Sequence, residues 1–318
     1  MNALRLGRFR FTLAEADGPN ELRWPEQVAI VEPKPLVNML RDVSLVGSDW
    51  PGRIEVQPIF GAPARIGLQL PANAWYATTF RVRPVPARAA LCLEELALAG
   101  DWNVWVNQHP VPREAFAPRR RWSNDNREAE VAPLLAEGLN EVLVRVRVTR
   151  PSDGLLDALH LLGDFGVFQD QSGWPVLGER PAVVRWTERH AGGYPYFSGT
   201  LRLSRSLPRE RLPAGAFRLR LPDEELMFAG VAELAINAQP LGVRAWAPFV
   251  WDVPAGLVAT DSSTTLSLSV TNTLVEQLEG KRYDPHRREV VPVLSQVADA
   301  TSGAAASAAS SVEDWLSL

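Results

Sequence analysis

The sequence contains a single cysteine, Cys92, which excludes an intrachain disulfide and a zinc site built from cysteines. Its four histidines are His109, His160, His190 and His286, and no two of them have the spacing of metal ligands. No apolar run approaches the roughly 20 residues that span a bilayer. Phosphate-loop, dinucleotide-binding and GxSxG motifs are missing too, which excludes the nucleotide and serine hydrolase sites that depend on them.

Neither sign of charge dominates the chain. Its 33 basic and 37 acidic residues give a formal net charge of −4, so no nucleic-acid partner is expected. The N-terminal stretch places arginines where a signal peptide would need its apolar centre. We therefore expect no membrane partner, and a chain that is either cytoplasmic or part of a longer, secreted protein.

Proline and tryptophan are plentiful, at 26 and 11 residues. This much proline favours short strands joined by loops over long helices. The clearest strand lies in residues 134–150, where a polar turn precedes strict alternation. One face of this strand carries Val142, Val144, Val146 and Val148. The other carries Arg145 and Arg147, and we expect it to be exposed to water. A half-buried strand needs a sheet and a second sheet over its valines, so the pattern predicts a β-sandwich.

Shorter strand patterns lie on both sides of this central strand. The expected strands are residues 4–11, 27–31, 53–57, 64–70, 75–82, 89–99, 104–107, 128–131 and 159–168. We expect residues 89–99 to form a hairpin with residues 104–107, and Cys92 to be a small buried hydrophobe within it. Glycine and proline are dense in residues 169–195, which indicates a linker.

The second half of the chain repeats the first at an offset of about 122 residues. Four segments of the first half, residues 79–82, 105–107, 130–132 and 146–149, match residues 200–203, 235–237, 252–254 and 268–271 in the same order. This repeat predicts two sandwiches of one plan. The expected domains are an N-terminal β-rich region at 1–74 packed on a first sandwich at 75–180, a second sandwich at 181–295, and a low-complexity tail at 296–318.

Each copy places an asparagine after an apolar pair, at residues 105–107 (Trp-Val-Asn) and 235–237 (Ala-Ile-Asn). The first copy then has a turn with Gly138 and Asn140, for which the second has residues 261–263 (Asp-Ser-Ser). These features resemble the galactose-binding-like, sugar-binding β-sandwich of glycoside hydrolase family 2.

A second resemblance lies at residues 193–200 (GYPYFSGT), which look like the start of the last sandwich in large bacterial α-L-rhamnosidase-like glycoside hydrolases. The resemblance as a whole covers about residues 75–290. It implies an all-β fold of two consecutive jelly-roll, galactose-binding-like β-sandwiches, here with an N-terminal β-rich extension.

Loops at the rim of a sandwich can surround a sugar with aromatic faces and polar groups. The candidates in the first copy are Trp102, Trp105, His109, Arg121, Trp122, Asn124 and Asp125. In the second copy they are Arg244, Trp246 and Trp251. The alternative is that the tryptophans are core residues and that residues 119–121 form a solvated loop. We expect Asn107 and Asn237 to be turn residues at strand ends.

No metal site and no cofactor are predicted from the residues. Acidic residues gather at Asp153, Asp157, Asp164 and Asp170, where capping or surface roles are expected. The resemblance adds a structural calcium ion as an alternative for some of them, although no EF-hand loop is present.

In the families that the chain resembles, the catalytic carboxylates lie in a separate barrel domain, which would need about 250 residues. We therefore expect a non-catalytic carbohydrate-binding or accessory module of a glycoside hydrolase-like protein. Its partners would be an oligosaccharide, or a plant or bacterial polysaccharide, and a catalytic domain upstream. The alternatives are a structural module that docks a catalytic barrel without touching sugar, and a small glycoside hydrolase in its own right.

Overall fold

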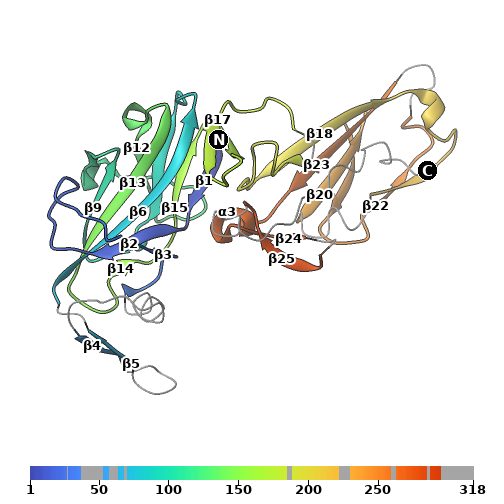
Figure 1. The fold of residues 1–318 in the computed structure, drawn as a ribbon. Coiled ribbons are helices and arrows are strands. Elements are labelled where there is room, and N and C mark those ends of the chain that lie inside the picture. Colours follow the sequence, from blue (N-terminus) through green and yellow to red (C-terminus); the bar gives the residue numbers. More distant parts are fainter. Residues whose placement is uncertain are drawn as a thin grey trace.

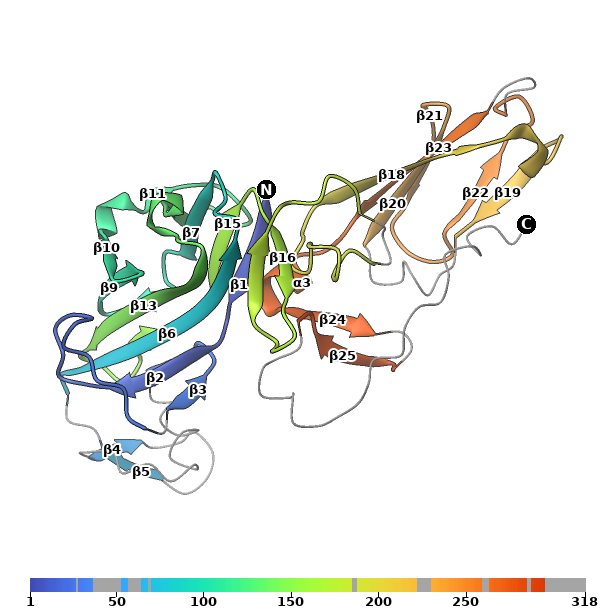
Figure 2. The same cartoon turned by 45° about the horizontal axis from the view of Figure 1, so that its top comes forward.

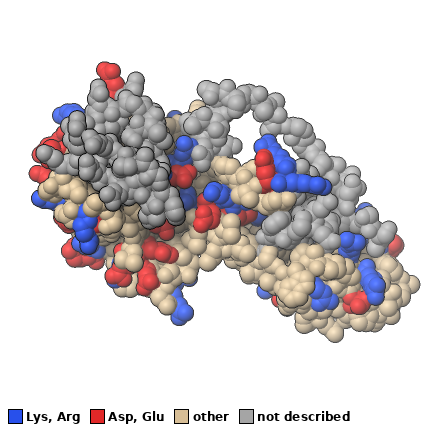
Figure 3. Space-filling view, turned by 90° about the horizontal axis from the view of Figure 1, so that it is seen from below, with Lys and Arg blue, Asp and Glu red and all other residues tan. Residues whose placement is uncertain are grey.

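The computed structural model describes residues 1–26, 28–36, 53–56, 64–67, 70–184, 188–221, 230–258, 263–284 and 287–294. They form an all-β protein of two sandwich-like units (Figure 1). None of the described helices is long and apolar enough to cross a membrane. Basic and acidic side chains are interspersed on the face seen from below, as the balanced composition predicts (Figure 3). The predicted tail at 296–318 lies outside the described residues.

The first unit is built from two facing sheets. The smaller has the strand order β1 (Asn2–Leu6), β15 (Leu159–Gly163), β7 (Ala89–Glu94), β12 (Asn126–Glu130), β11 (Ala117–Pro118). The larger has the order β10 (His109–Val111), β9 (Asp101–Val106), β13 (Gly138–Val148), β6 (Ala72–Arg83), β17 (Pro175–Gly178), β16 (Gly166–Gln169). β2 (Phe9–Leu13) pairs with β6 and with β3 (Ala29–Val31). Two small pairs, β8 (Leu98–Ala99) with β14 (Gly154–Leu155) and β4 (Arg53–Val56) with β5 (Ala64–Gly67), complete the strands of this half.

The alternation of β13 places its four valines in the core between the two sheets. Val142, Val144, Val146 and Val148 are all fully buried, so this prediction is confirmed. The opposite face of β13 is only partly exposed, which corrects the expectation that it is wet. Leu143 is 4% exposed there and packs with Trp75 and Leu22 in a second apolar cluster. A polar face was expected because the segment that supplies Leu22 is distant in sequence.

The second unit repeats the strand order of the first. Its larger sheet has the order β18 (Thr200–Leu207), β23 (Thr264–Thr271), β20 (Val231–Ile236), β21 (Gln239–Arg244). This is the order of β6, β13, β9 and β10 in the first unit. β19 (Phe217–Arg220) pairs with β22 (Val250–Val253) as β7 pairs with β12. The sequence repeat therefore corresponds to a repeat of the fold.

The matching turns of the two units are held by equivalent asparagines. Asn107 and Asn237 have φ angles of 50° and 48°, in the left-handed region that two-residue hairpin turns require. The Oδ1 atom of Asn107 accepts the backbone N–H of Glu141, and that of Asn237 accepts the N–H of Thr265, both at 2.9 Å. The turn role predicted for both asparagines is confirmed.

Three expectations about the first unit need correction. β7 does not form a hairpin with β9: it lies in the smaller sheet between β12 and β15, and the chain crosses to the larger sheet after Ala99. The strand expected at 159–168 is two strands, β15 and β16, in different sheets. The chain crosses at Gly163, where a Cβ atom would lie 2.3 Å from the Arg88 carbonyl oxygen. Residues 169–195 are not simply a linker, because β17 pairs in parallel with β6.

The first strands of the expected N-terminal extension, β1 and β2, belong to the sandwich itself, whereas β4 and β5 pair only with each other. β1 is the edge strand of the smaller sheet, and β2 pairs with β6 in the larger one. Each therefore supplies core residues, among them Leu4 and Phe11, rather than packing from outside. The single strand expected at residues 4–11 is therefore wrong, because the chain passes from one sheet to the other between Leu6 and Phe9. Alternation shows extended structure here, but the sheet to which each strand belongs depends on partners more than 60 residues away.

After the second unit the chain returns to the first. A short helix, α3 (Val275–Glu279), and a hairpin of β24 (Lys281–Asp284) and β25 (Glu289–Pro292) lie beside β1 and β16 (Figure 2). The backbone oxygens of Gln277 and Leu278 accept hydrogen bonds from His160 Nε2 at 3.1 Å and Arg5 Nε at 2.7 Å. Val293 is buried in the core of the first unit. The last described segment thus belongs structurally with the beginning of the chain.

Candidate functional site

The larger sheet of the first unit has an opening along one edge of β6. β2 runs antiparallel to β6 and covers residues 74–77, whereas β17 runs parallel to it and covers residues 81–83. Among the described strands, none pairs with residues 78–80 on this side. The sheet is therefore split where β2 and β17 diverge.

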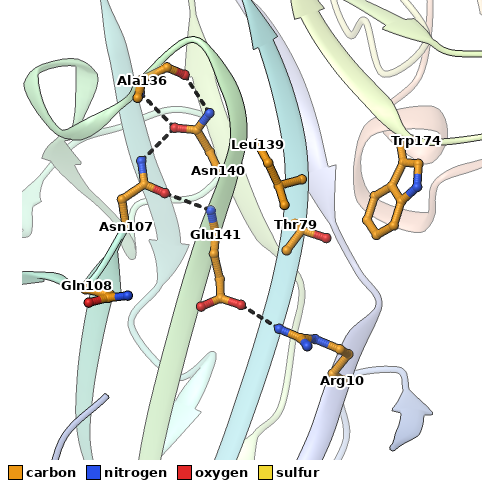
Figure 4. Close-up of a pocket in the computed structure, with 9 residues that line it drawn as sticks. All are labelled: Arg10, Thr79, Asn107, Gln108, Ala136, Leu139, Asn140, Glu141 and Trp174. Atoms are coloured by element: carbon orange, nitrogen blue, oxygen red, sulfur yellow. Dashed lines mark hydrogen bonds and ion pairs between the residues drawn. The ribbon is translucent and has the colours of Figure 1, made fainter. Parts of the chain in front are cut away.

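Two adjoining cavities meet at this split. One, of about 570 Å³, lies over the face of the sheet and is lined by Arg10, Thr79, Asn107, Gln108, Ala136, Leu139, Asn140, Glu141 and Trp174 (Figure 4). The other, of about 520 Å³, extends from the split toward β24 and β25. Arg10, Thr79 and Trp174 line both. We call the two together the groove.

Fixed polar side chains form one wall of the groove. An Nη atom of Arg10 contacts Oε2 of Glu141 at 2.5 Å, and the Arg10 guanidinium lies 4.6 Å from the ring centre of Trp24. Asn107 holds the backbone of Glu141, and Asn140 in turn accepts a hydrogen bond from Asn107 Nδ2 at 2.7 Å. The hairpin asparagine therefore also positions the ion pair (Figure 4).

Trp174 forms the opposite wall and is positioned by a tight loop. Oδ1 of Asp170 accepts the backbone N–H groups of Ser172 and Trp174, both at 2.9 Å. Gly173 has a φ of 81°, which a side chain would strain. Asp170 also pairs with Arg81 at 3.2 Å. A half-buried indole thus faces an ion pair, a threonine hydroxyl and amide groups, which is the combination that holds the ring and hydroxyls of a sugar.

The structure separates the tryptophans proposed for the rim of the first unit. Trp102 and Trp105 lie on opposite faces of β9. Trp102 is 8% exposed and packs edge-on against Phe116, whereas Trp105 stacks on Trp75 with ring centres 5.5 Å apart. Both rings are occupied by protein neighbours. For these two residues the alternative reading as packing residues fits the structure.

The remaining candidates of the first unit are divided between two places. Arg121 makes a two-pronged ion pair with Glu128, and the indole N–H of Trp122 donates to Glu94 Oε1 at 2.8 Å. Arg121 and Trp122 together line a separate cavity of about 370 Å³. The other candidates, His109, Asn124 and Asp125, are exposed and line none of these cavities.

The candidates of the second unit also do not converge on one site. Trp251 is fully buried, and its indole N–H donates to the Gly242 carbonyl at 2.8 Å, so it is a core residue. Nε of Arg244 donates to the Val250 carbonyl at 2.9 Å. Trp246 is 78% exposed. None of the ten candidates lines the groove, and its lining residues Arg10, Thr79, Glu141 and Trp174 are not among those predicted from the sequence.

The four clustered aspartates have local structural partners. Asp153 is 1% exposed and caps the turn before it by accepting the backbone N–H groups of Thr149 and Arg150. Asp157 accepts the N–H of Ala158, and Asp164 pairs with Arg180. Asp170 forms the loop of Trp174. Among the described residues, no group of three or more His, Cys, Asp or Glu side chains is placed to hold a metal ion.

Two titratable side chains are buried on the outer face of the smaller sheet, directly opposite each other on β7 and β15. Cys92 is fully buried, as expected, and burial raises the pKa of its thiol to about 12. Burial lowers the pKa of His160 to about 4, although its bond to Gln277 opposes the shift. A carbonyl only accepts, so that bond requires a proton on Nε2, which in the neutral imidazole leaves Nδ1 unprotonated.

We expect stability to fall below pH 6.5 because of His160. Between pH 6.5 and about pH 4, His160 is protonated in the unfolded chain but stays neutral in the folded protein. Protonation therefore favours the unfolded state, and the free energy of unfolding should fall by about 3 kcal/mol from pH 7 to pH 4. His160→Gln keeps an N–H donor for Gln277 but cannot titrate. Denaturant unfolding of both proteins between pH 7 and pH 4.5 should show a shallower decline for the variant. Identical slopes would contradict the assignment.

No protein-family model matches the chain, and no curated protein matches its sequence. Among solved structures it is similar to a β-D-mannosidase from Dictyoglomus thermophilum, at 12% identity and a TM-score of 0.35, over 86% of this chain and 31% of the other. A glycosyl hydrolase family 2 member from Bacteroides cellulosilyticus matches at 12% identity and a TM-score of 0.34, over 86% and 31%. The exo-chitosanase CsxA from Amycolatopsis orientalis matches at 13% identity and a TM-score of 0.38, over 86% and 29%.

The chain therefore spans about a third of the length of these enzymes and is similar to parts of them. At identities of 12–13% and TM-scores below 0.5, the similarity assigns neither a family nor an activity.

Proposed function

We propose that this chain is a non-catalytic carbohydrate-binding or accessory part of a glycoside hydrolase-like protein, and that oligosaccharide binds in the groove. The observation that carries the proposal is the pairing of Trp174 with the polar wall formed by Arg10, Glu141 and Thr79. An indole face covers the C–H side of a sugar ring, while charged and amide groups bind its hydroxyls. The two repeats also resemble the sugar-binding β-sandwich of glycoside hydrolase family 2, which agrees with this chemistry.

Both walls are fixed before any ligand arrives, which reduces the ordering cost of binding. Asp170 fixes the loop of Trp174, and Asn107 fixes the strand of Glu141. The polar side chains Arg10, Thr79 and Glu141 come from strands β2, β6 and β13 rather than from long loops. A small, preformed groove of this kind suits a short stretch of a polysaccharide chain.

Calorimetric titration with a panel of neutral and acidic oligosaccharides tests the proposal. Trp174→Ala should weaken binding about tenfold, because it removes the aromatic face of the groove. Trp246→Ala removes an exposed tryptophan of the second unit and is the matched control, with unchanged affinity expected. If Trp174→Ala and the unaltered protein bind the sugar equally well, the sugar binds outside the groove. No binding at millimolar concentration would reject carbohydrate binding, and turnover of an aryl glycoside would reject the non-catalytic assignment.

A second candidate function is a structural module that docks a catalytic domain without touching sugar. It is favoured by the exposed apolar pair Val243 and Trp246 on β21 and the loop after it, at 54% and 78% exposure. It also agrees with the burial of Trp102 and the stacking of Trp105 on Trp75. If the titrations show no sugar, binding of a catalytic domain that is lost in Trp246→Ala would support this candidate.

A further inference from the structure

One guanidinium group in the groove is held in place by a single nitrogen, and its other two nitrogens have no hydrogen-bond acceptor among the described residues. Arg5 lies on β1, and its Nε donates to the Leu278 carbonyl at 2.7 Å. A Cβ atom on Gly7 would lie 1.8 Å from Nη1 of Arg5, and a Cβ atom on Gly280 would lie 3.4 Å from the same nitrogen. The guanidinium is therefore packed between two glycines, and any side chain at Gly7 would displace it.

The free end of Arg5 belongs to the part of the groove near β24. The bond to Leu278 uses Nε, and none of the described residues accepts a hydrogen bond from Nη1 or Nη2. Arginine presents its N–H groups as a rigid planar fork that matches the two oxygens of a carboxylate. With one edge fixed by Leu278, the fork is oriented before a ligand binds.

Other charges in this part of the groove add to the same preference. Arg8 and Arg10 are half-buried and line the same cavity as Arg5. The carboxylates that line it, Glu32 and Glu279, are exposed and therefore well solvated. Arg10 is already paired with Glu141, so Arg5 and Arg8 are the half-buried charges of this cavity that have no ion-pair partner among the described residues. Both are positive, although the whole chain carries a net charge of −4.

We infer that the groove takes an acidic sugar, with the carboxylate of a uronate residue bound by Arg5 and a neighbouring ring against Trp174. This inference rests on the proposed function and specifies its ligand class. A uronate brings together the two features that the groove offers, a planar carboxylate for the fork and a sugar ring for the indole. Inorganic phosphate shares the anionic chemistry but lacks the ring.

Gly7→Ala tests the inference with little disturbance of the fold. The added methyl group meets the far end of a flexible side chain, so Arg5 should move while the backbone stays. Gly18→Ala is the matched control, because nothing lies within 4 Å of the added Cβ. Arg8→Gln is a second variant that lowers the positive charge without touching the glycines. Thermal unfolding of each variant confirms that it is folded.

The probes are an oligogalacturonide, a neutral galacto-oligosaccharide of the same length, and inorganic phosphate. The unaltered protein and Gly18→Ala should bind the oligogalacturonide about tenfold more tightly than the neutral sugar. Gly7→Ala should lose this preference and keep its affinity for the neutral sugar, and Arg8→Gln should reduce the preference. Equal affinity for both sugars, or a preference retained in Gly7→Ala, would overturn the inference but leave the proposed function intact. Phosphate binding as tight as that of the oligogalacturonide would also overturn it, as a general anion site. Failure of both sugars to bind would instead reject the proposed function.

Discussion

Asn140→Ala is expected to lower the free energy of unfolding of the first unit by about 4 kcal/mol. The side chain is 1% exposed and makes four hydrogen bonds. It accepts from Asn107 Nδ2 and the Ala136 N–H, and donates to the carbonyls of Ala136 and Gly138, at 2.7 to 3.1 Å. Alanine would leave these groups without their partner, and each unsatisfied group costs about 1 to 3 kcal/mol. Chemical denaturation followed by tryptophan fluorescence measures the loss.

The second unit provides the control for this substitution. Asn237→Ala removes the bonds to the Thr265 N–H and the Leu257 carbonyl, from a side chain that is exposed to water. Water can replace these bonds, so a cost of about 1 kcal/mol is expected. A larger loss for Asn237→Ala than for Asn140→Ala would show that burial does not set the cost. Asn140→Ala should also disturb the groove, because Asn140 holds Asn107, and Asn107 holds the backbone of Glu141.

Glu276→Ala is expected to lower the free energy of unfolding by about 4 kcal/mol, because it removes the carboxylate of a buried ion pair and leaves the partner side chains in place. Glu276 Oε1 accepts from Arg189 at 2.6 Å and from His190 at 2.9 Å. Burial opposes the charge on Glu276, but the His190 hydrogen bond and the Arg189 charge outweigh it and hold its pKa below the ordinary value. Its contribution is therefore present above the pKa of the unfolded carboxyl and is lost as the pH falls through the lower folded pKa.

Glu279→Ala is the matched control for this prediction. Glu279 lies on the same helix but is exposed, so its removal should change stability by no more than about 0.5 kcal/mol. Limited proteolysis provides a second measurement, because loss of the Glu276 bonds should loosen α3 and speed cleavage after the second unit. Equal stabilities and cleavage rates of the two variants would show that the ion pair does not hold α3.

The sequence predicted the parts of the fold that depend on local patterns. β13 was found because four valines alternate with Leu143, Arg145 and Arg147. The repeat was found because four segments recur in the same order, among them the asparagine turns after β9 and β20. Each signal reports on backbone geometry within about ten residues. The sheet to which a strand belongs was not predicted for β7 or β16, since alternation shows that a face is buried but not which strand lies beside it.

The groove was missed for the same physical reason. It exists because β2 and β17, about 160 residues apart in sequence, share one edge of β6 and leave a gap between them. Trp174 stands in a glycine- and proline-rich stretch that looks like a linker, and Arg10 is one of several arginines in an alternating strand. Tryptophan density instead indicated Trp102 and Trp105, which the structure uses for packing.

Hydrogen bonds of Asn272 tie together the two chain segments that enter and leave the second unit, and this affects how the molecule can be divided. Asn272 donates to the Phe197 carbonyl at 2.5 Å and accepts the N–H of Gly199 at 2.9 Å, so the incoming and outgoing chain ends of that unit are tied together. The second unit is therefore inserted into the first, between the strands of its sheets and the helix α3 that packs against them. A single truncation between the two units would remove the segment that covers β1 and β15. Deleting the second unit and joining residue 199 to residue 272 would keep that segment.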